Sequence, residues 1–196
     1  MAHGIGSHPV TAAGHVARPS CVLMAGLPGS GKTTLSRALT ARGFVRLCPD
    51  EEMFRRHGVY GVDFPRGVFP TLERPVLEET ALELSEQLRA GHDVVVDHGF
   101  WTPGDRAHWR SIADEAGAIT LLVYLEASHE ELWARVSQRN ARHAADPNSI
   151  YFAESDLLRY RTRFVPPGPD EAHLVYNGDP ESVLKALNEV AQQSKG

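Results

Sequence analysis

Cysteine, lysine and long apolar runs are scarce in this sequence of 196 residues. Its two cysteines, Cys21 and Cys48, lack the CxxC spacing of a metal or redox site, and each lies in an apolar stretch. We therefore expect two reduced, buried thiols and no disulfide framework. The longest apolar run, residues 118–125, is too short to span a bilayer, and the first residues lack the apolar core of a signal peptide. These absences predict a cytoplasmic protein without a membrane segment.

Positive charge is also limited. Lysine and arginine together number 20 against 25 acidic residues, which gives a formal net charge of −5, and only three of the 20 are lysines. A protein that binds duplex nucleic acid over a broad face needs clustered positive charge, so this class of protein is disfavoured. A local basic groove remains compatible with the composition. Hydrophobic residues make up 42% of the chain, which is typical of a globular protein, and the length fits one domain with a small lid.

The order of apolar and amphipathic segments predicts the fold class. Residues 1–19 are rich in Gly, Ala, His and Pro without periodicity, so we expect a flexible tail followed by one domain over 20–196. From residue 20 onward, short apolar runs alternate with helical periodicity, the pattern of a parallel sheet covered by helices. The expected strands are 21–25, 44–48, 94–96, 119–125 and 174–176. The expected helices are 32–41, 75–90, 104–116, 129–142, 152–163 and 181–190. We expect residues 54–70 to form a long irregular insertion.

The most specific motif is segment 26–33, which reads Gly-Leu-Pro-Gly-Ser-Gly-Lys-Thr and matches GxxxxGK[ST] between a predicted strand and helix. Its glycines let backbone N–H groups turn toward nucleotide phosphates, and the next helix points its positive dipole end at them. Lys32 is expected to neutralise the phosphates and Thr33 to bind Mg²⁺. The motif predicts ATP and Mg²⁺ as ligands, while the absence of an NKxD pattern disfavours a GTPase. The residues expected to hold the nucleotide are Gly26, Gly29, Ser30, Gly31, Lys32, Thr33 and Thr34.

Two acidic residues follow predicted strands. Asp50 comes after the second strand, and Asp97 ends the third, so both emerge at the carboxyl edge where open α/β sheets bind ligands. Asp50 is placed to accept the proton of an attacking hydroxyl, or alternatively to cap the helix that begins after it. Asp97 is placed to hold Mg²⁺ or its waters, or alternatively to cap a turn.

Three arginines recur at helical spacing after the fourth strand. Arg135, Arg139 and Arg142 lie on one face, where bidentate guanidinium groups suit the charge of a transferring phosphoryl group. The alternative is a solvated face, because Glu131 precedes Arg135 by four residues, the spacing of an ordinary helix ion pair. We favour a functional role for Arg135 and Arg139.

The loop after the third strand carries polar and aromatic side chains toward the same edge. His98, Trp101 and Arg106 are candidate acceptor-binding residues there, with packing as the alternative for each.

The sequence resembles the small AAA-type P-loop kinases. The resemblance rests on segment 26–33, which corresponds to their P-loop, and on Asp50, segment 97–101, Arg135 and Arg139. That group includes chloramphenicol phosphotransferase, zeta-toxin kinases and the kinase module of polynucleotide kinases. The resemblance implies a three-layer α/β P-loop kinase fold, with a five-stranded parallel sheet in the order 2-3-1-4-5, helices on both faces and a helical lid over about 129–163. It also implies that Asp50 is the general base, that Arg135 and Arg139 contact phosphates, and that Asn177 and Gly178 lie near the adenine.

The sequence therefore predicts an ATP-dependent kinase that phosphorylates a hydroxyl of a small molecule, such as an antibiotic or nucleoside. Two alternatives remain open. A polynucleotide 5′-hydroxyl kinase needs a basic channel, and a regulatory protein needs ATP binding without transfer. The cations available for such a channel are Arg74, Arg106, Arg161 and Arg163.

Overall fold

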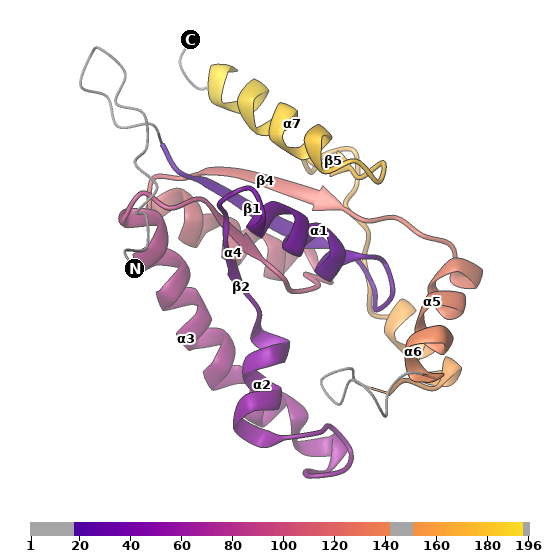
Figure 1. Cartoon of the computed structure of the whole chain (residues 1–196). Helices are drawn as coiled ribbons and strands as arrows, with labels where there is room; N and C mark the ends of the chain where they lie inside the picture. The colour runs from indigo at the N-terminus through magenta and orange to yellow at the C-terminus, as the bar shows by residue number, and fades with distance from the viewer. Residues whose placement is uncertain (1–17, 142–150, 194–196) are drawn as a thin grey trace, which may run out of the picture.

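The computed structural model describes residues 18–141 and 151–193 (Figure 1). Most of the predicted tail and Arg142 lie outside the described residues. The described chain begins against the sheet, because Arg18 donates hydrogen bonds to the carbonyls of Gly117 and Ala118 at 2.9 and 2.7 Å. The boundary between tail and domain stays a prediction, although Arg18, which was assigned to the tail, contacts the chain just before the fourth strand.

A five-stranded parallel sheet forms the centre of the molecule, in the order β2-β3-β1-β4-β5. Both the order and the α/β class agree with the prediction. Residues 21–25 of the central strand β1 are completely buried because helices cover both faces, which is why this stretch is an unbroken apolar run. The strands are β1 (Ser20–Ala25), β2 (Val45–Leu47), β3 (Val94–Val96), β4 (Ile119–Tyr124) and β5 (Leu174–Val175).

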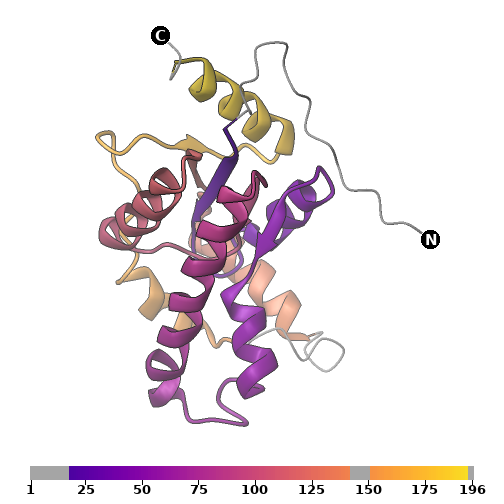
Figure 2. The same cartoon turned by 90° about the vertical axis from the view of Figure 1, so that its left-hand side faces the viewer.

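Two pairs of helices cover the two faces of the sheet (Figures 1 and 2). On one face, α3 (Phe69–Arg89) and α4 (Pro103–Glu115) bury Leu84, Leu88 and Trp109 against the strands. On the other, α1 (Lys32–Thr40) and α7 (Pro180–Gln193) form a second buried cluster with the sheet. None of the helices in the described part of the chain has the length and apolar character needed to cross a membrane.

The expected irregular insertion is helical at its two ends, and only residues 58–65 lie outside helices. Residues 54–57 complete α2 (Pro49–His57), and α3 begins at Phe69, with Pro75 inside it and not at its start. The proline misled the helix prediction, because it removes one backbone donor without ending this helix. Aromatic packing compensates: Phe64 stacks near Phe69 at a ring distance of 6.2 Å, over buried Met53 and Val76. Helices α2 and α3 therefore pack together, and this pair is called the arm below.

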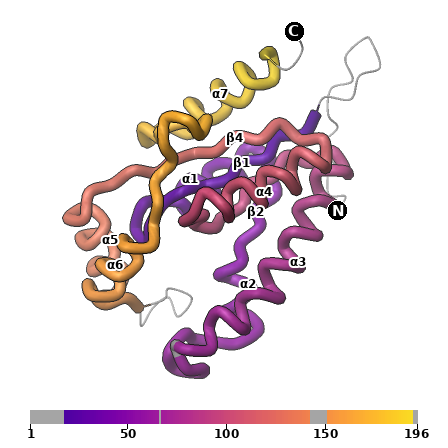
Figure 3. Tube along the Cα trace, turned by 180° about the vertical axis from the view of Figure 1, so that it is seen from behind, coloured from indigo at the N-terminus to yellow at the C-terminus, as the bar shows by residue number. Residues whose placement is uncertain are grey.

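Two further helices do not belong to the pairs that cover the sheet. They are α5 (His129–Ala141), which follows β4, and α6 (Glu154–Arg161), which is shorter than the expected helix over 152–163. Leu132 and Leu157 pack with Leu27 of the P-loop, so this pair of helices is attached to that loop. Figure 3 shows the arm of α2 and α3 on one side of the molecule and α5 with α6 on the other.

Candidate active site

The P-loop connects β1 to α1 through a backbone that only glycine adopts easily. Gly29 and Gly31 have positive φ angles of 87° and 103°. A Cβ atom on Gly29 would lie 2.9 Å from the carbonyl oxygen of Leu132, so a side chain there would push α5 away. Within the described residues, the buried hydroxyl of Ser30 has no hydrogen-bond partner. A loop with an unpaired buried hydroxyl and two left-handed glycines suits a bound phosphate.

Lys32 folds back over its own loop. Its ammonium donates hydrogen bonds to the carbonyl oxygens of Gly26 and Leu27 at 3.0 and 3.1 Å. Burial lowers the pKa of Lys32, and the carboxylates of Asp50 and Asp97 act in the opposite direction. The loop therefore surrounds one positive charge that two nearby acids help to keep protonated.

The carboxylate of Asp97 is hydrogen-bonded mainly through one of its two oxygens. Its Oδ2 accepts a hydrogen bond from Ser36 Oγ at 2.8 Å and two from the guanidinium of Arg46, while its Oδ1 faces the Thr33 hydroxyl at 3.5 Å. Only 3% of Asp97 is exposed. Asp97 Oδ1 and the Thr33 hydroxyl are hard oxygen ligands of the kind that Mg²⁺ prefers, so Thr33 and Asp97 fit the predicted metal.

Sequence reasoning missed Arg46. Its guanidinium spans two acids, because it also donates to both carboxylate oxygens of Glu51, at 2.8 and 3.0 Å. An arginine in the middle of a buried apolar strand was the available signal, since such a charge needs partners.

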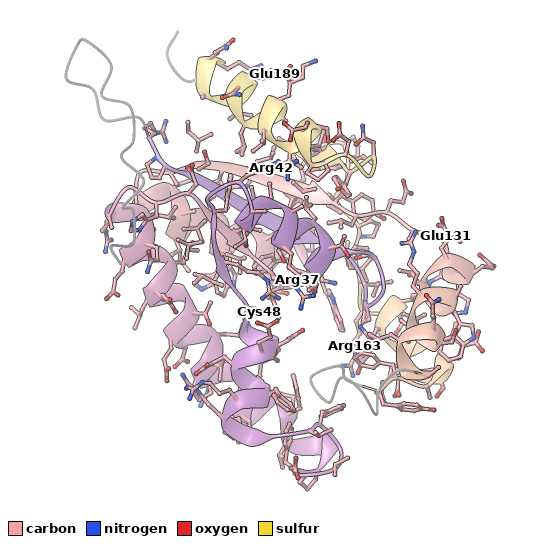
Figure 4. The ribbon with its side chains drawn as sticks, viewed as in Figure 1. Arg37, Arg42, Cys48, Glu131, Arg163 and Glu189 are labelled. Carbon is pink, nitrogen blue, oxygen red and sulfur yellow. The ribbon has the colours of Figure 1, made fainter. Side chains whose placement is uncertain are left out.

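Asp50 meets two other polar side chains beyond the sheet edge. The ligand atoms of Asp50, Glu73 and His98 all lie within 4.8 Å of one another. Asp50 lies in the first turn of α2, whose N-cap residue is Cys48, so the alternative that Asp50 caps this helix is wrong. Cys48 lies where β2 runs into α2 (Figure 4).

Glu73 was also missed. It lies on α3, between the insertion expected over 54–70 and the helix expected from residue 75, so the sequence did not place its side chain. Burial, with Asp50 and Asp105 as nearby negative charges, raises the pKa of Glu73 to about 7. Burial lowers the pKa of His98, against the attraction of Asp50. This group of Asp50, Glu73 and His98 is called the carboxylate cluster below.

The turn that carries His98 touches the P-loop. A Cβ atom on Gly99 would lie 2.7 Å from the Gly26 carbonyl oxygen and 3.3 Å from Lys32 Cε. Trp101, two residues on, packs against Tyr160 of α6 at a ring distance of 5.0 Å. The P-loop and the carboxylate cluster are therefore adjacent, with Gly99 between them. Trp101 lies next to α6.

Arg106 does not belong to this site. Only 1% of it is exposed, and its guanidinium donates to both carboxylate oxygens of Glu171 at 2.7 and 2.6 Å. It also donates to the carbonyls of Phe100 and Val165 at 3.3 and 2.9 Å. All of its donating nitrogens thus have protein acceptors. We correct the expectation of acceptor binding: Arg106 ties the segment after α6 to α4.

The two arginines of α5 face the P-loop. Arg135 Nη1 donates to the Gly29 carbonyl oxygen at 3.3 Å, and its ion pair with Glu131 is longer, at 3.8 Å. Arg139 lies over the Phe152 ring at 5.4 Å, and its charge lowers the pKa of Lys32. Glu131 and Arg163 appear on this side of the molecule in Figure 4. Guanidinium groups so placed suit phosphate binding.

The loop after β5 is shaped by Asn177. Its Oδ1 accepts hydrogen bonds from the Asp179 N–H at 3.0 Å and the Ser182 hydroxyl at 3.1 Å, and Gly178 has a φ of 95°. The structure shows an exposed turn that starts α7. The adenine contact predicted for Asn177 and Gly178 stays a prediction.

Comparisons with known proteins identify the family and the fold. Residues 21–167 match the family described as AAA domain. No curated protein sequence matches the chain.

Three solved structures illustrate the shared fold. A protein of Chloroflexus aurantiacus, provisionally assigned as a kinase, is 22% identical with a TM-score of 0.69, over 88% of this chain and 98% of that one. A gluconokinase from Sinorhizobium meliloti is 17% identical with a TM-score of 0.57, over 90% and 93%. The APS kinase CysC of Mycobacterium tuberculosis, in complex with AMPPNP and APS, is 18% identical with a TM-score of 0.57, over 89% and 98%. At such identities the likeness establishes the P-loop kinase fold.

Proposed function

Because the chain belongs to the AAA domain family and has the P-loop kinase fold, we propose that it is an ATP-dependent kinase with a small-molecule hydroxyl as acceptor. One observation carries the proposal. The P-loop with Lys32 touches the turn at Gly99, and the preceding residue, His98, lies beside the carboxylate of Asp50. A phosphate-binding loop and a proton-accepting group on adjacent segments are the two parts that phosphoryl transfer to a hydroxyl requires.

In the proposed reaction each of the predicted site residues has one role. Asp50 takes the proton of the acceptor hydroxyl as its oxygen forms a bond to the γ-phosphorus of ATP. The bond from that phosphorus to the β–γ bridging oxygen breaks, and ADP leaves with the electron pair. Lys32 moves from the loop carbonyls to the phosphates, and Arg135 and Arg139 stabilise the charge on the transferring group. Thr33 and Asp97 would hold Mg²⁺, which would neutralise phosphate charge.

The surroundings of Asp50 favour a small acceptor over a polynucleotide. A channel for a polynucleotide backbone needs several free cations, and Arg106, one of the four considered, is buried against Glu171. Two carboxylates, Asp50 and Glu73, stand where the acceptor would bind, and they repel backbone phosphates.

The test is transfer of phosphate from ATP to a panel of hydroxylated compounds, read by mass spectrometry. We expect a phosphorylated product with the wild-type protein and none with Lys32→Ala, whose thermal unfolding should stay close to wild type because a P-loop lysine serves the bound phosphates. ATP binding without transfer to any acceptor would favour the regulatory alternative. Transfer to 5′-hydroxyl oligonucleotides, falling steeply with added salt, would favour the polynucleotide kinase.

A further inference from the structure

Glu73 has no role in the reaction described above, although it is one of three groups in the carboxylate cluster. It reaches this place from α3, whereas Asp50 comes from α2 and His98 from the turn after β3. The charged groups that act on the cluster are Asp50 and Asp105 on Glu73, and Lys32, Asp50, Asp97 and Asp105 on His98. Glu73 is half-buried among them without an ion-pair partner at its own carboxylate within the described residues.

Two carboxylates side by side have more accepting oxygens than one hydroxyl satisfies. An ionised carboxylate accepts hydrogen bonds only, so each needs a donor. In the proposed reaction, the reacting hydroxyl of the acceptor donates its hydrogen bond to Asp50. A second donor on the same molecule would satisfy Glu73, whereas an anionic group in that place would face Asp50, Glu73 and Asp105 together.

Resting on the proposed kinase function, we infer that Glu73 is an acceptor-binding residue that selects molecules with a second hydrogen-bond donor beside the reacting hydroxyl. A neighbouring hydroxyl or a protonated amine provides that donor, and acceptors with a negative group in that place are rejected. The raised pKa of Glu73 is consistent with this role, because its carboxylate is poorly stabilised until a ligand donates to it.

The test uses pairs of acceptors that differ by the second donor. D-ribose and 2-deoxy-D-ribose, or adenosine and 2′-deoxyadenosine, form matched pairs; kanamycin presents amines, and ribose 5-phosphate and gluconate present anions. Transfer is measured with the wild-type protein, with Glu73→Gln, and with Glu78→Gln as a control on the same helix, whose side chain is 70% exposed.

We expect transfer to a neutral or amine-bearing acceptor and little to the anions. Glu73→Gln should raise the KM for that acceptor about 10- to 100-fold, the usual worth of a hydrogen bond to a charged group, with kcat and the KM for ATP within about twofold. The deoxy analogue should lose affinity with the wild-type protein but little more with Glu73→Gln, because the two changes remove the same contact. Glu78→Gln should match the wild type.

Three results would overturn the inference and leave the kinase standing: preferred transfer to the anionic acceptors, an unchanged acceptor KM in Glu73→Gln, or independent losses from the deoxy analogue and the variant. Tight Zn²⁺ binding by the wild-type protein that Glu73→Gln abolishes would also overturn it, in favour of a metal held by the cluster. Transfer to no compound by a protein that binds ATP would instead count against the proposed function itself.

Discussion

Arg46 holds Asp97 by one oxygen, with Nε at 2.9 Å and Nη2 at 2.5 Å from Oδ2. This ion pair leaves Oδ1 on the side of Thr33, where the predicted metal would bind. Asp97 is buried, so its orientation depends on the arginine and on Ser36 rather than on water. The strand β2 thus positions an acid that directly follows β3.

Removing Arg46 should therefore weaken the fold. Arg46→Ala leaves Asp97 as an unpaired buried charge, and we expect a loss of about 3 kcal/mol in the free energy of unfolding, measured with urea. Arg42→Ala is the control: it breaks the more exposed pair with Glu181 and should cost less than about 1 kcal/mol. Similar losses of unfolding free energy in the two variants would mean that the buried pair stabilises the fold no more than the exposed pair does.

The arginines of α5 should affect the reaction more than nucleotide binding. Arg135→Ala or Arg139→Ala is expected to lower kcat about 10²-fold, because each guanidinium acts on charge that develops during transfer, with the Kd for ATP changed much less. Arg89→Ala, at the exposed end of α3, serves as the control for loss of a cation. Loss of stability alone, with kcat preserved, would support the solvated-face alternative.

Glu73 should destabilise the unliganded protein at alkaline pH. Its pKa is about 7 in the folded protein against 4.5 as the ordinary value, so the unfolded chain loses this proton first. Stability therefore falls as pH rises from about 4.5 to 7 and stays constant above, as far as this group contributes. We expect Glu73→Gln to be more stable than wild type at pH 8 by about 1 kcal/mol, with little difference at pH 4.5. A difference independent of pH in urea unfolding would contradict this.

Most of the fold was predictable because its signals are local. A strand buried on both faces is an apolar run, and a helix against a sheet repeats its apolar residues every three to four positions. The P-loop is equally local, since Gly29, Gly31 and Lys32 act within one turn of chain. The strand order followed from resemblance to a family, not from pattern alone.

The missed residues act between distant segments. Arg46 meets Asp97 across 51 positions of sequence, and Glu73 meets His98 only because α3 begins before Pro75. The same limit explains the error at Arg106, which was expected to bind the acceptor and instead pairs with Glu171, 65 residues away. Spacing rules do not reach such pairs.

The central claim is that Asp50 accepts the proton of the acceptor, and Asp50→Asn tests it most directly. Because Asp50 does not cap α2 through its side chain, asparagine should leave the fold and the Kd for ATP unchanged. We expect the rate of transfer, measured in a single turnover with saturating ATP and acceptor, to fall about 10²- to 10⁴-fold, the usual worth of a positioned base. A rate within about twofold of wild type, with ATP bound equally well, would contradict the claim.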